Sequence, residues 1–412
     1  MMLSSSLVAF SALAVSVLAY DNSRNDNVAV YWGQNSYGAA HGADQPNWQK
    51  TISHYCQDDA IDVLPVSFVT VFFGIGGLPH INLANICNEV DNSTFPGTAL
   101  ADCSALAEDI KQCQARGKVL PLSLGGATGA IGFVSDAQAA EEFATTIWNL
   151  FLGGSSDTRP FGNAILDGVD LDIEGGSPSH YTAFVNKLRE YYAGGDKSYY
   201  VFAAPQCPFP DHYMGEVLNN AHIDAVYVQF YNNYCGLPAY PAEAFNWAAW
   251  EDWALNVSPN KDVKVYVGAP AHITAANNGF VEIDRLREIA LEKQASSSVF
   301  GGVMLWDASQ AYANGRFDLA IKNALTGSGS LGPSGPSTPA PETPAPSPQV
   351  CVGTEEWVET EGYKQGSKAQ NDGRLWEAKW GTARETPGGL GVWEDLGECK
   401  SEGKVHARDL RL

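Results

Sequence analysis

Eight short apolar segments, separated by longer amphipathic stretches, are the feature that most restricts how this chain can fold. Most of the eight are apolar throughout, which is typical of parallel strands buried on both faces of a sheet. The stretches between them, such as 139–150, 181–192 and 281–292, show helical periodicity. The segments predicted as strands are 28–32, 66–73, 119–124, 168–173, 199–204, 225–229, 263–269 and 302–305.

Eight strand-then-helix units over roughly 300 residues predict an α/β fold of the (β/α)8 TIM-barrel type. An open, doubly wound sheet is the alternative. That fold favours a glycine-rich phosphate turn after the first strand, and the segment YWGQN at residues 31–35 is not such a turn.

Composition divides the remainder of the chain. An apolar run at 7–18 followed by Ala19 predicts a signal peptide, and Gly, Ser, Thr and Pro dominate a later segment that predicts an extended linker. Beyond it, Cys351 and Cys399 bracket a short Trp-rich segment. The expected divisions are a signal peptide at 1–19, a barrel domain at 20–325, a linker at 326–349, a small disulfide-stapled β-rich module at 350–400 and a polar tail at 401–412.

The formal net charge of −22 argues against nucleic acid and anionic membrane surfaces as partners, because both attract an excess of Lys and Arg. We expect no membrane contact and a secreted monomer, extracellular or associated with a cell wall. Asn92 and Asn256 begin possible glycosylation sequons, the second weakened by Pro259. Eight cysteines fit an exported chain. None forms a CxxC pair and few His lie nearby, so we expect no zinc site. No other metal and no cofactor is suggested.

The segment LDGVDLDIE at residues 166–174 carries the strongest chemical signal. Asp170, Asp172 and Glu174 alternate with apolar residues, so on a strand their carboxyls share one face. Crowding like charges where water is scarce can hold one carboxylic acid protonated near neutral pH. The pattern predicts acid catalysis, with a metal site or a buried ion-pair cluster as alternatives. Asp167 has the opposite parity, which predicts a role at the start of the strand.

In a barrel, the C-terminal ends of the strands converge on one cleft. Carboxyls, amides, a phenol and an indole would meet there, a combination that suits a sugar, with aromatic faces against its C–H groups. Phe73 fits either the wall of this cleft or the core. The residues that we expect at the cleft are Tyr31, Gln34, Asp170, Asp172, Glu174, Gln206, Gln229, Tyr231, Asn232 and Trp306.

Several of these segments, taken in order, resemble one family. LDGVDLDIE resembles the DxxDxDxE signature of family 18 glycoside hydrolases, and SLGG at 123–126 resembles their SxGG motif. YWGQN, INLANIC, AAPQCPFPD, VQFYNN and GGVMLW resemble the hevamine-like class III chitinases of plants and fungi. The resemblance covers about residues 28–307. It implies a (β/α)8 barrel that hydrolyses β-1,4 bonds between N-acetylglucosamine units with retention, the substrate's own acetamide acting as nucleophile.

The resemblance also implies a role for each matching residue. Glu174 would be the general acid and base, and Asp172 would hold the acetamide N–H while sharing a proton with Asp170. Tyr231 would hold the acetamide oxygen. Gln229 would contact the same sugar, Trp306 would form the floor of the cleft, and Tyr31 and Gln34 would line it, while Ser123, Gly125 and Gly126 would shape the barrel beside Asp170. The implied disulfides are Cys56–Cys113, Cys87–Cys103 and Cys207–Cys235, and Cys351–Cys399 would staple the small module.

Two other functions remain open. An endo-β-N-acetylglucosaminidase acting on N-glycans would use the same acid and acetamide chemistry. A non-hydrolytic chitin-binding lectin or inhibitor is the other alternative, although such relatives usually lack the glutamate that is present here as Glu174. Chitin or chitooligosaccharide is the expected partner in the main hypothesis.

The small module resembles the type-3 chitin-binding module through its W-x-A-x-W, PG and GVW elements. Trp380 is the expected sugar contact, whereas Trp376 and Trp393 fit a core better than a binding surface. In the pattern of that module two Trp are often adjacent. Here Gly381 follows Trp380 instead.

Overall fold

The computed structural model describes residues 20–129, 131–133, 137–328, 351, 354–358, 362–379, 381–383, 386–387 and 392–399. The predicted signal peptide, nearly all of the predicted linker, the polar tail and Trp380 lie outside the described residues.

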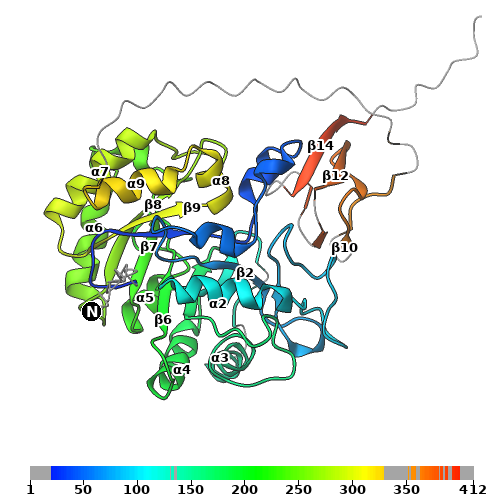
Figure 1. Ribbon diagram of the computed structural model, residues 1–412, viewed down its shortest axis with the longest axis horizontal. Helices are drawn as coiled ribbons and strands as arrows, with labels where there is room; N and C mark the ends of the chain where they lie inside the picture. The colour runs from blue at the N-terminus through cyan, green and yellow to red at the C-terminus, as the bar shows by residue number, and fades with distance from the viewer. Residues whose placement is uncertain are drawn as a thin grey trace, which may run out of the picture.

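Eight parallel strands form a closed barrel, as the apolar segments predict (Figure 1). Each strand pairs with its neighbour in the order β1-β9-β8-β7-β6-β5-β4-β2. Backbone bridges from Ala29 to Val63 and from Trp32 to Val66 close the ring between its first and last members. The strands are β1 (Asn27–Val30), β2 (Val66–Val71), β4 (Leu122–Gly126), β5 (Gly168–Ile173), β6 (Tyr200–Ala203), β7 (Ala225–Gln229), β8 (Lys264–Pro270) and β9 (Phe300–Trp306), with β3 (His80–Ile81) antiparallel to β2.

Helices cover the outside of the barrel (Figure 1). In the longest of them, apolar residues recur every three or four positions and face the sheet, which is why it forms an amphipathic helix there. The helices are α1 (Ser36–Ala40), α2 (Ala107–Ala115), α3 (Ala137–Phe151), α4 (Tyr181–Ala193), α5 (Gly215–Asn220), α6 (Trp247–Asp252), α7 (Ile283–Ser296), α8 (Ala308–Ala313) and α9 (Phe317–Leu325). Shorter turns are the 3₁₀ segments Gln45–Asn47, Ile52–Cys56, Ile75–Gly77, Ser104–Leu106 and Leu237–Ala239, and the π segment Trp253–Val257.

The four disulfides join the pairs expected from the sequence. Cys56–Cys113, Cys87–Cys103 and Cys207–Cys235 lie in the barrel domain, and Cys351–Cys399 closes the small module. Each covalent loop restricts the unfolded chain, an effect worth about 2–4 kcal/mol per bond.

Three buried or half-buried carboxylates at the N-terminal ends of the strands are paired with cations. Asp62, Asp167 and Asp224 contact Lys322, Lys197 and Arg189, each at 2.7 Å. Each of the three also accepts a backbone N–H from a neighbouring strand segment, at 2.7–2.8 Å. For Asp167 this is the predicted role at the start of the strand, since it lies immediately before β5.

The C-terminal module is a small β structure. One sheet contains β11 (Lys368–Asn371), β12 (Arg374–Ala378) and β14 (Trp393–Glu398), and a second pairs β10 (Gly362–Tyr363) with β13 (Thr382–Ala383). Trp393 is buried and Trp376 is half-buried, with its indole N–H donating to the carbonyl of Asn371. Both therefore belong more to the packing of the module than to an open binding face.

Candidate active site

The three carboxyls of β5 lie at successive depths along the axis of the barrel. Asp170 is fully buried, Asp172 is 4% exposed, and Glu174, just beyond the strand, is half-buried at its mouth. β5 is buried along its whole length, because its alternate residues pack against the outer helices. The period of two in the sequence therefore directs all three acids inward.

Asp170, the deepest acid, is held by hydroxyl groups. The hydroxyls of Tyr31 and Ser123 donate to its Oδ2 at 2.7 and 2.6 Å, and its Oδ1 has no hydrogen-bond partner among the described residues. Burial raises the pKa of Asp170 to about 6, although both hydroxyl bonds act in the opposite direction. The neutral acid is thus stabilised well above its ordinary range.

Asp172 and Glu174 act as a coupled pair. Burial raises the pKa of both carboxyls, and the negative charges of Glu174 and Asp170 raise that of Asp172 further. A side-chain hydrogen bond between the two raises the pKa of Asp172 and lowers that of Glu174. The amide of Gln229 donates to Asp172 Oδ1 at 2.9 Å. The proton shared between Asp170 and Asp172 that the resemblance implies stays a prediction.

A cleft of about 600 Å³ opens above these acids. Trp306, at the end of β9, lines the cleft and stacks on Phe68 at 5.9 Å between ring centroids. Tyr231, which is buried, also lines the cleft, as do Gln229 and Asn232. Other lining residues include Gln34, Ser36, Ala39, Ala40, Asn82, Thr274 and Val392.

The SLGG segment shapes the cleft from β4. Gly125 has φ of +111°, and a Cβ there would lie 2.3 Å from the carbonyl oxygen of Asp172. Only glycine lets the two strands approach so closely. Ser123 lies beside Asp170 as expected, whereas Gly125 and Gly126 line the cleft itself.

Three sequence-predicted residues differ in position from expectation. Tyr31 is 1% exposed and lies beneath the cleft, bonded to Asp170, rather than lining it. Gln206 is not among the residues that line the cleft, and its side-chain oxygen accepts from Asn233 at 3.0 Å. Phe73 is 52% exposed and packs against Phe143, so it is neither core nor cleft wall.

Two acids near the site escaped the sequence analysis. Asp211 follows β6 and accepts backbone N–H bonds from Tyr213 and Met214, and its charge raises the pKa of both Asp172 and Glu174. Asp307 follows Trp306, and its Oδ2 accepts the N–H of Ser36 at 2.9 Å. Asp307 comes just after a predicted strand, and Asp211 is the last residue of the segment AAPQCPFPD, but neither position by itself indicates an acid beside the site.

Neither a metal centre nor a membrane span is found in the part of the chain that the structure describes. There, no group of three or more His, Cys, Asp and Glu side chains is arranged to hold an ion. The helices described are also too short or too polar to cross a bilayer.

A closed (β/α)8 barrel with a carboxyl-lined cleft at the C-terminal ends of its strands defines an enzyme-like scaffold of the glycosidase type. Comparison with known proteins then identifies the family. The profile of glycosyl hydrolases family 18 matches residues 27–282, and the chain belongs to that family.

Individual relatives show the range of proteins built on this fold. "Chitinase 2" of Rhizopus oligosporus is 46% identical over 325 residues, which is 78% of this chain, but the chain spans only 57% of that relative's length. A chitinase from Ipomoea carnea has a similar structure at 33% identity, with a TM-score of 0.60 over 72% of this chain and 99% of its own. A xylanase and alpha-amylase inhibitor from Scadoxus multiflorus is similar at 30% identity and a TM-score of 0.59, over 74% and 99%.

Proposed function

We propose that this chain is a secreted endochitinase, which hydrolyses internal β-1,4 bonds between N-acetylglucosamine units with retention at the anomeric carbon. The observation that carries the proposal is the coupled pair Asp172–Glu174 at the floor of the cleft, with pKa values raised by burial. The 46% identity to a protein named as a chitinase supports the choice of substrate.

In the first step, Glu174 donates its proton to the glycosidic oxygen as the bond between that oxygen and the anomeric carbon breaks. The acetamide oxygen of the same sugar attacks the anomeric carbon from the opposite face, and a cyclic oxazolinium ion forms. Asp172 accepts a hydrogen bond from the acetamide N–H and stabilises the positive charge. Tyr231, which lines the cleft beside these acids, orients the acetamide oxygen for attack.

In the second step, the Glu174 carboxylate takes a proton from water while the water oxygen attacks the anomeric carbon. The bond between that carbon and the acetamide oxygen breaks, and Glu174 recovers its proton. Two inversions at one carbon give net retention. The scheme needs one carboxyl that both loses and regains a proton, which a raised pKa favours.

Trp306 and Tyr231 give the site its selectivity for a sugar ring. An indole face packs against the C–H face of a pyranose, and the neighbouring amides of Gln229 and Asn232 supply hydrogen bonds to its substituents.

Two hydrolysis assays and one xylanase-inhibition assay, run in parallel, test the function. The wild-type chain should release reducing ends from chitopentaose and leave a high-mannose N-glycan and a xylanase reaction unaffected. Cleavage of the N-glycan with chitopentaose untouched would favour an endo-β-N-acetylglucosaminidase. Inhibition of the xylanase without hydrolysis of either sugar would favour an inhibitor, as the name of the Scadoxus multiflorus protein suggests for that relative.

A further inference from the structure

The C-terminal module packs against the barrel at one end of the cleft. Figure 1 shows its strands β12 and β14 beside the blue segment that carries α1. Side chains from both parts form one buried apolar cluster, in which Trp48 and Ala84 of the barrel lie with residues of the module. The module residues of this cluster are Tyr363, Ala369, Ala378, Val392 and Trp393.

Two polar contacts fasten this interface. The ammonium of Lys379 donates to the carbonyl of Ala39 in α1, and the backbone N–H of Gly381 donates to Asp91 Oδ2 at 2.6 Å. Burial lowers the pKa of Lys379, as expected for an amine enclosed between two packed surfaces.

Gly381 is the residue that makes the close approach possible. A Cβ at this position would lie 2.4 Å from Asp91 Oδ2 and 2.6 Å from Asn88 Oδ1. Asn88 is itself buried, and its amide donates to Ala84 and Asp91. A larger residue at 381 would therefore displace the Asp91 and Asn88 side chains and disturb this contact between the module and the barrel.

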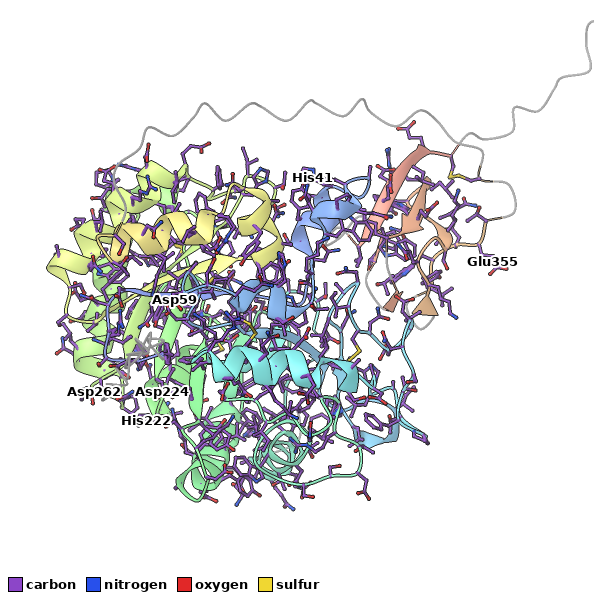
Figure 2. The ribbon with its side chains drawn as sticks, in the orientation of Figure 1. His41, Asp59, His222, Asp224, Asp262 and Glu355 are labelled. Carbon is purple, nitrogen blue, oxygen red and sulfur yellow. A yellow bond between two sulfur atoms is a disulfide. The ribbon has the colours of Figure 1, made fainter. Side chains whose placement is uncertain are left out.

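The segment that carries α1 and contacts the module is also hydrogen-bonded to residues that follow β9. Ser36, at the start of α1, donates its N–H to Asp307, the residue next to Trp306. Tyr37 donates its N–H to the hydroxyl of Ser309 at 3.0 Å. Figure 2 shows His41 on this segment, close to the module. The position of the module relative to Trp306 is thus set by a continuous chain of contacts.

One residue of the module reaches the cleft. Val392, immediately before β14, lines it together with Ala39 and Ala40 of the barrel. Val392 is 6% exposed and also belongs to the buried cluster that joins the module to the barrel.

We propose that the C-terminal module is a fixed wall of the substrate cleft, so that a long β-1,4-linked N-acetylglucosamine chain bound there continues past Ala39 and Ala40 onto Val392. This inference rests on the proposed function for the identity of the ligand. It assigns the module a part in binding long chains that does not depend on its tryptophans. A short oligosaccharide that occupies only the region above Glu174 would not contact the module.

The test uses full-length chains with the interface broken by Lys379→Glu, which places a carboxylate against the carbonyl of Ala39 and beside Glu394. The matched control is Lys364→Glu, an exposed change on the same module. Gly381→Val breaks the interface independently, with Gly194→Ala as its control, since a Cβ at Gly194 would meet only the Tyr191 carbonyl at 3.8 Å.

Small-angle scattering measures whether the module is docked on the barrel, and steady-state kinetics measure how docking affects the binding of long substrates. Both interface variants should have a larger radius of gyration than wild type and the two controls. Their KM for chitohexaose should rise about fivefold, the loss expected for one apolar side-chain contact. Their kcat/KM on a fluorogenic chitobioside should stay within about twofold of wild type.

Two results would overturn the proposal. A wild-type chain as extended as Lys379→Glu would show that the module is not docked, and an unchanged KM for chitohexaose in extended variants would show that it is no part of the cleft. Failure of the proposed function is distinct from both, because a wild-type chain that cleaves neither sugar would still report docking by scattering.

Discussion

The acidic side chains at the two ends of the barrel have different partners. At the N-terminal ends of the strands, Asp62, Asp167 and Asp224 each contact a Lys or Arg at 2.7 Å. At the C-terminal ends, Asp170, Asp172, Glu174, Asp211 and Asp307 have no Lys or Arg nitrogen within 4.0 Å among the residues that the structure describes. Their partners are hydroxyls, amides, backbone N–H groups and one another (Figure 2 labels Asp224 at the paired end).

This difference in partners distinguishes acids that stabilise the fold from acids that can take part in catalysis. A buried carboxylate with a cation beside it fastens strands together, and it loses its value when the cation is removed. A buried carboxyl without a cation favours its neutral form, and can deliver a proton when a substrate needs one. The following changes should affect the first group through stability and the second through turnover or pH dependence.

The largest effect should come from Lys322→Met at the paired end. Lys322 donates to Asp62 at 2.7 Å and to the carbonyl of Asp26 at 2.8 Å, and its loss leaves a buried acid without its closest cation. The free energy of unfolding should fall by about 3–5 kcal/mol, while turnover per folded molecule stays unchanged. Urea denaturation measures the change. In the control Lys187→Met, which removes an exposed pair with Glu190, the loss should be much smaller. Equal losses in the two variants would remove the distinction between the ends.

Asp172→Asn should show the reverse behaviour. Turnover should fall about 100-fold or more, because the asparagine cannot take the charge that stabilises the intermediate. The free energy of unfolding should change by less than about 1 kcal/mol, since no cation is left unpaired and a like charge is removed next to Glu174. Kinetics and denaturation on the same preparation decide the point. A variant that unfolds readily but turns over normally would place Asp172 with the structural acids.

Asp170→Asn should change how stability depends on pH. The pKa of Asp170 is raised from 3.8 to about 6 by burial, so the folded state binds the proton more tightly than the unfolded chain does. The stability that this supplies is full below about pH 3.8 and is lost as the pH rises through about 6. Relative to the Asn variant, wild type should thus lose roughly 3 kcal/mol across this window. Denaturation midpoints measured at several pH values would test this, and a constant difference would contradict the raised pKa.

The smallest effect should come from Asp211→Asn. The charge of Asp211 raises the pKa of Glu174 and Asp172, so its removal lowers both. Glu174 then loses its proton at lower pH, and the alkaline limb of the kcat/KM profile should move down by a few tenths of a pH unit. Asp262→Asn, an exposed change at the opposite end of the molecule (Figure 2), serves as the control and should leave the profile in place. A shift toward alkaline pH would contradict the assignment.

The sequence predicts the barrel because parallel strands that are buried on both faces have continuous apolar sequences. β5 and β7 occupy 168–173 and 225–229 as expected, and the other six strands differ from their predicted ranges by a few residues at their ends. The inward direction of Asp170, Asp172 and Glu174 follows from the same period of two. These features depend on local patterns, which a single sequence contains.

Other features depend on contacts between distant segments, and the sequence does not contain them. Tyr31 was expected in the cleft wall, but its hydroxyl turns inward to Asp170, 139 positions away. Gln206 was expected to meet the substrate, but Asn233 occupies its side-chain oxygen. Asp211 was missed because its influence acts through space on Glu174. The docking of Gly381 on Asp91 joins residues 290 positions apart, and no local pattern signals it.

The central element of the proposed mechanism is Glu174, the proton donor in a retaining cleavage. Proton NMR of the first products from chitopentaose, recorded for wild type beside Glu174→Gln, tests that claim directly. Wild type should release β-anomers before mutarotation, and the variant should release almost none while it remains folded and still binds the sugar. Prompt α-anomers from wild type, or cleavage by Glu174→Gln at the wild-type rate, would contradict it.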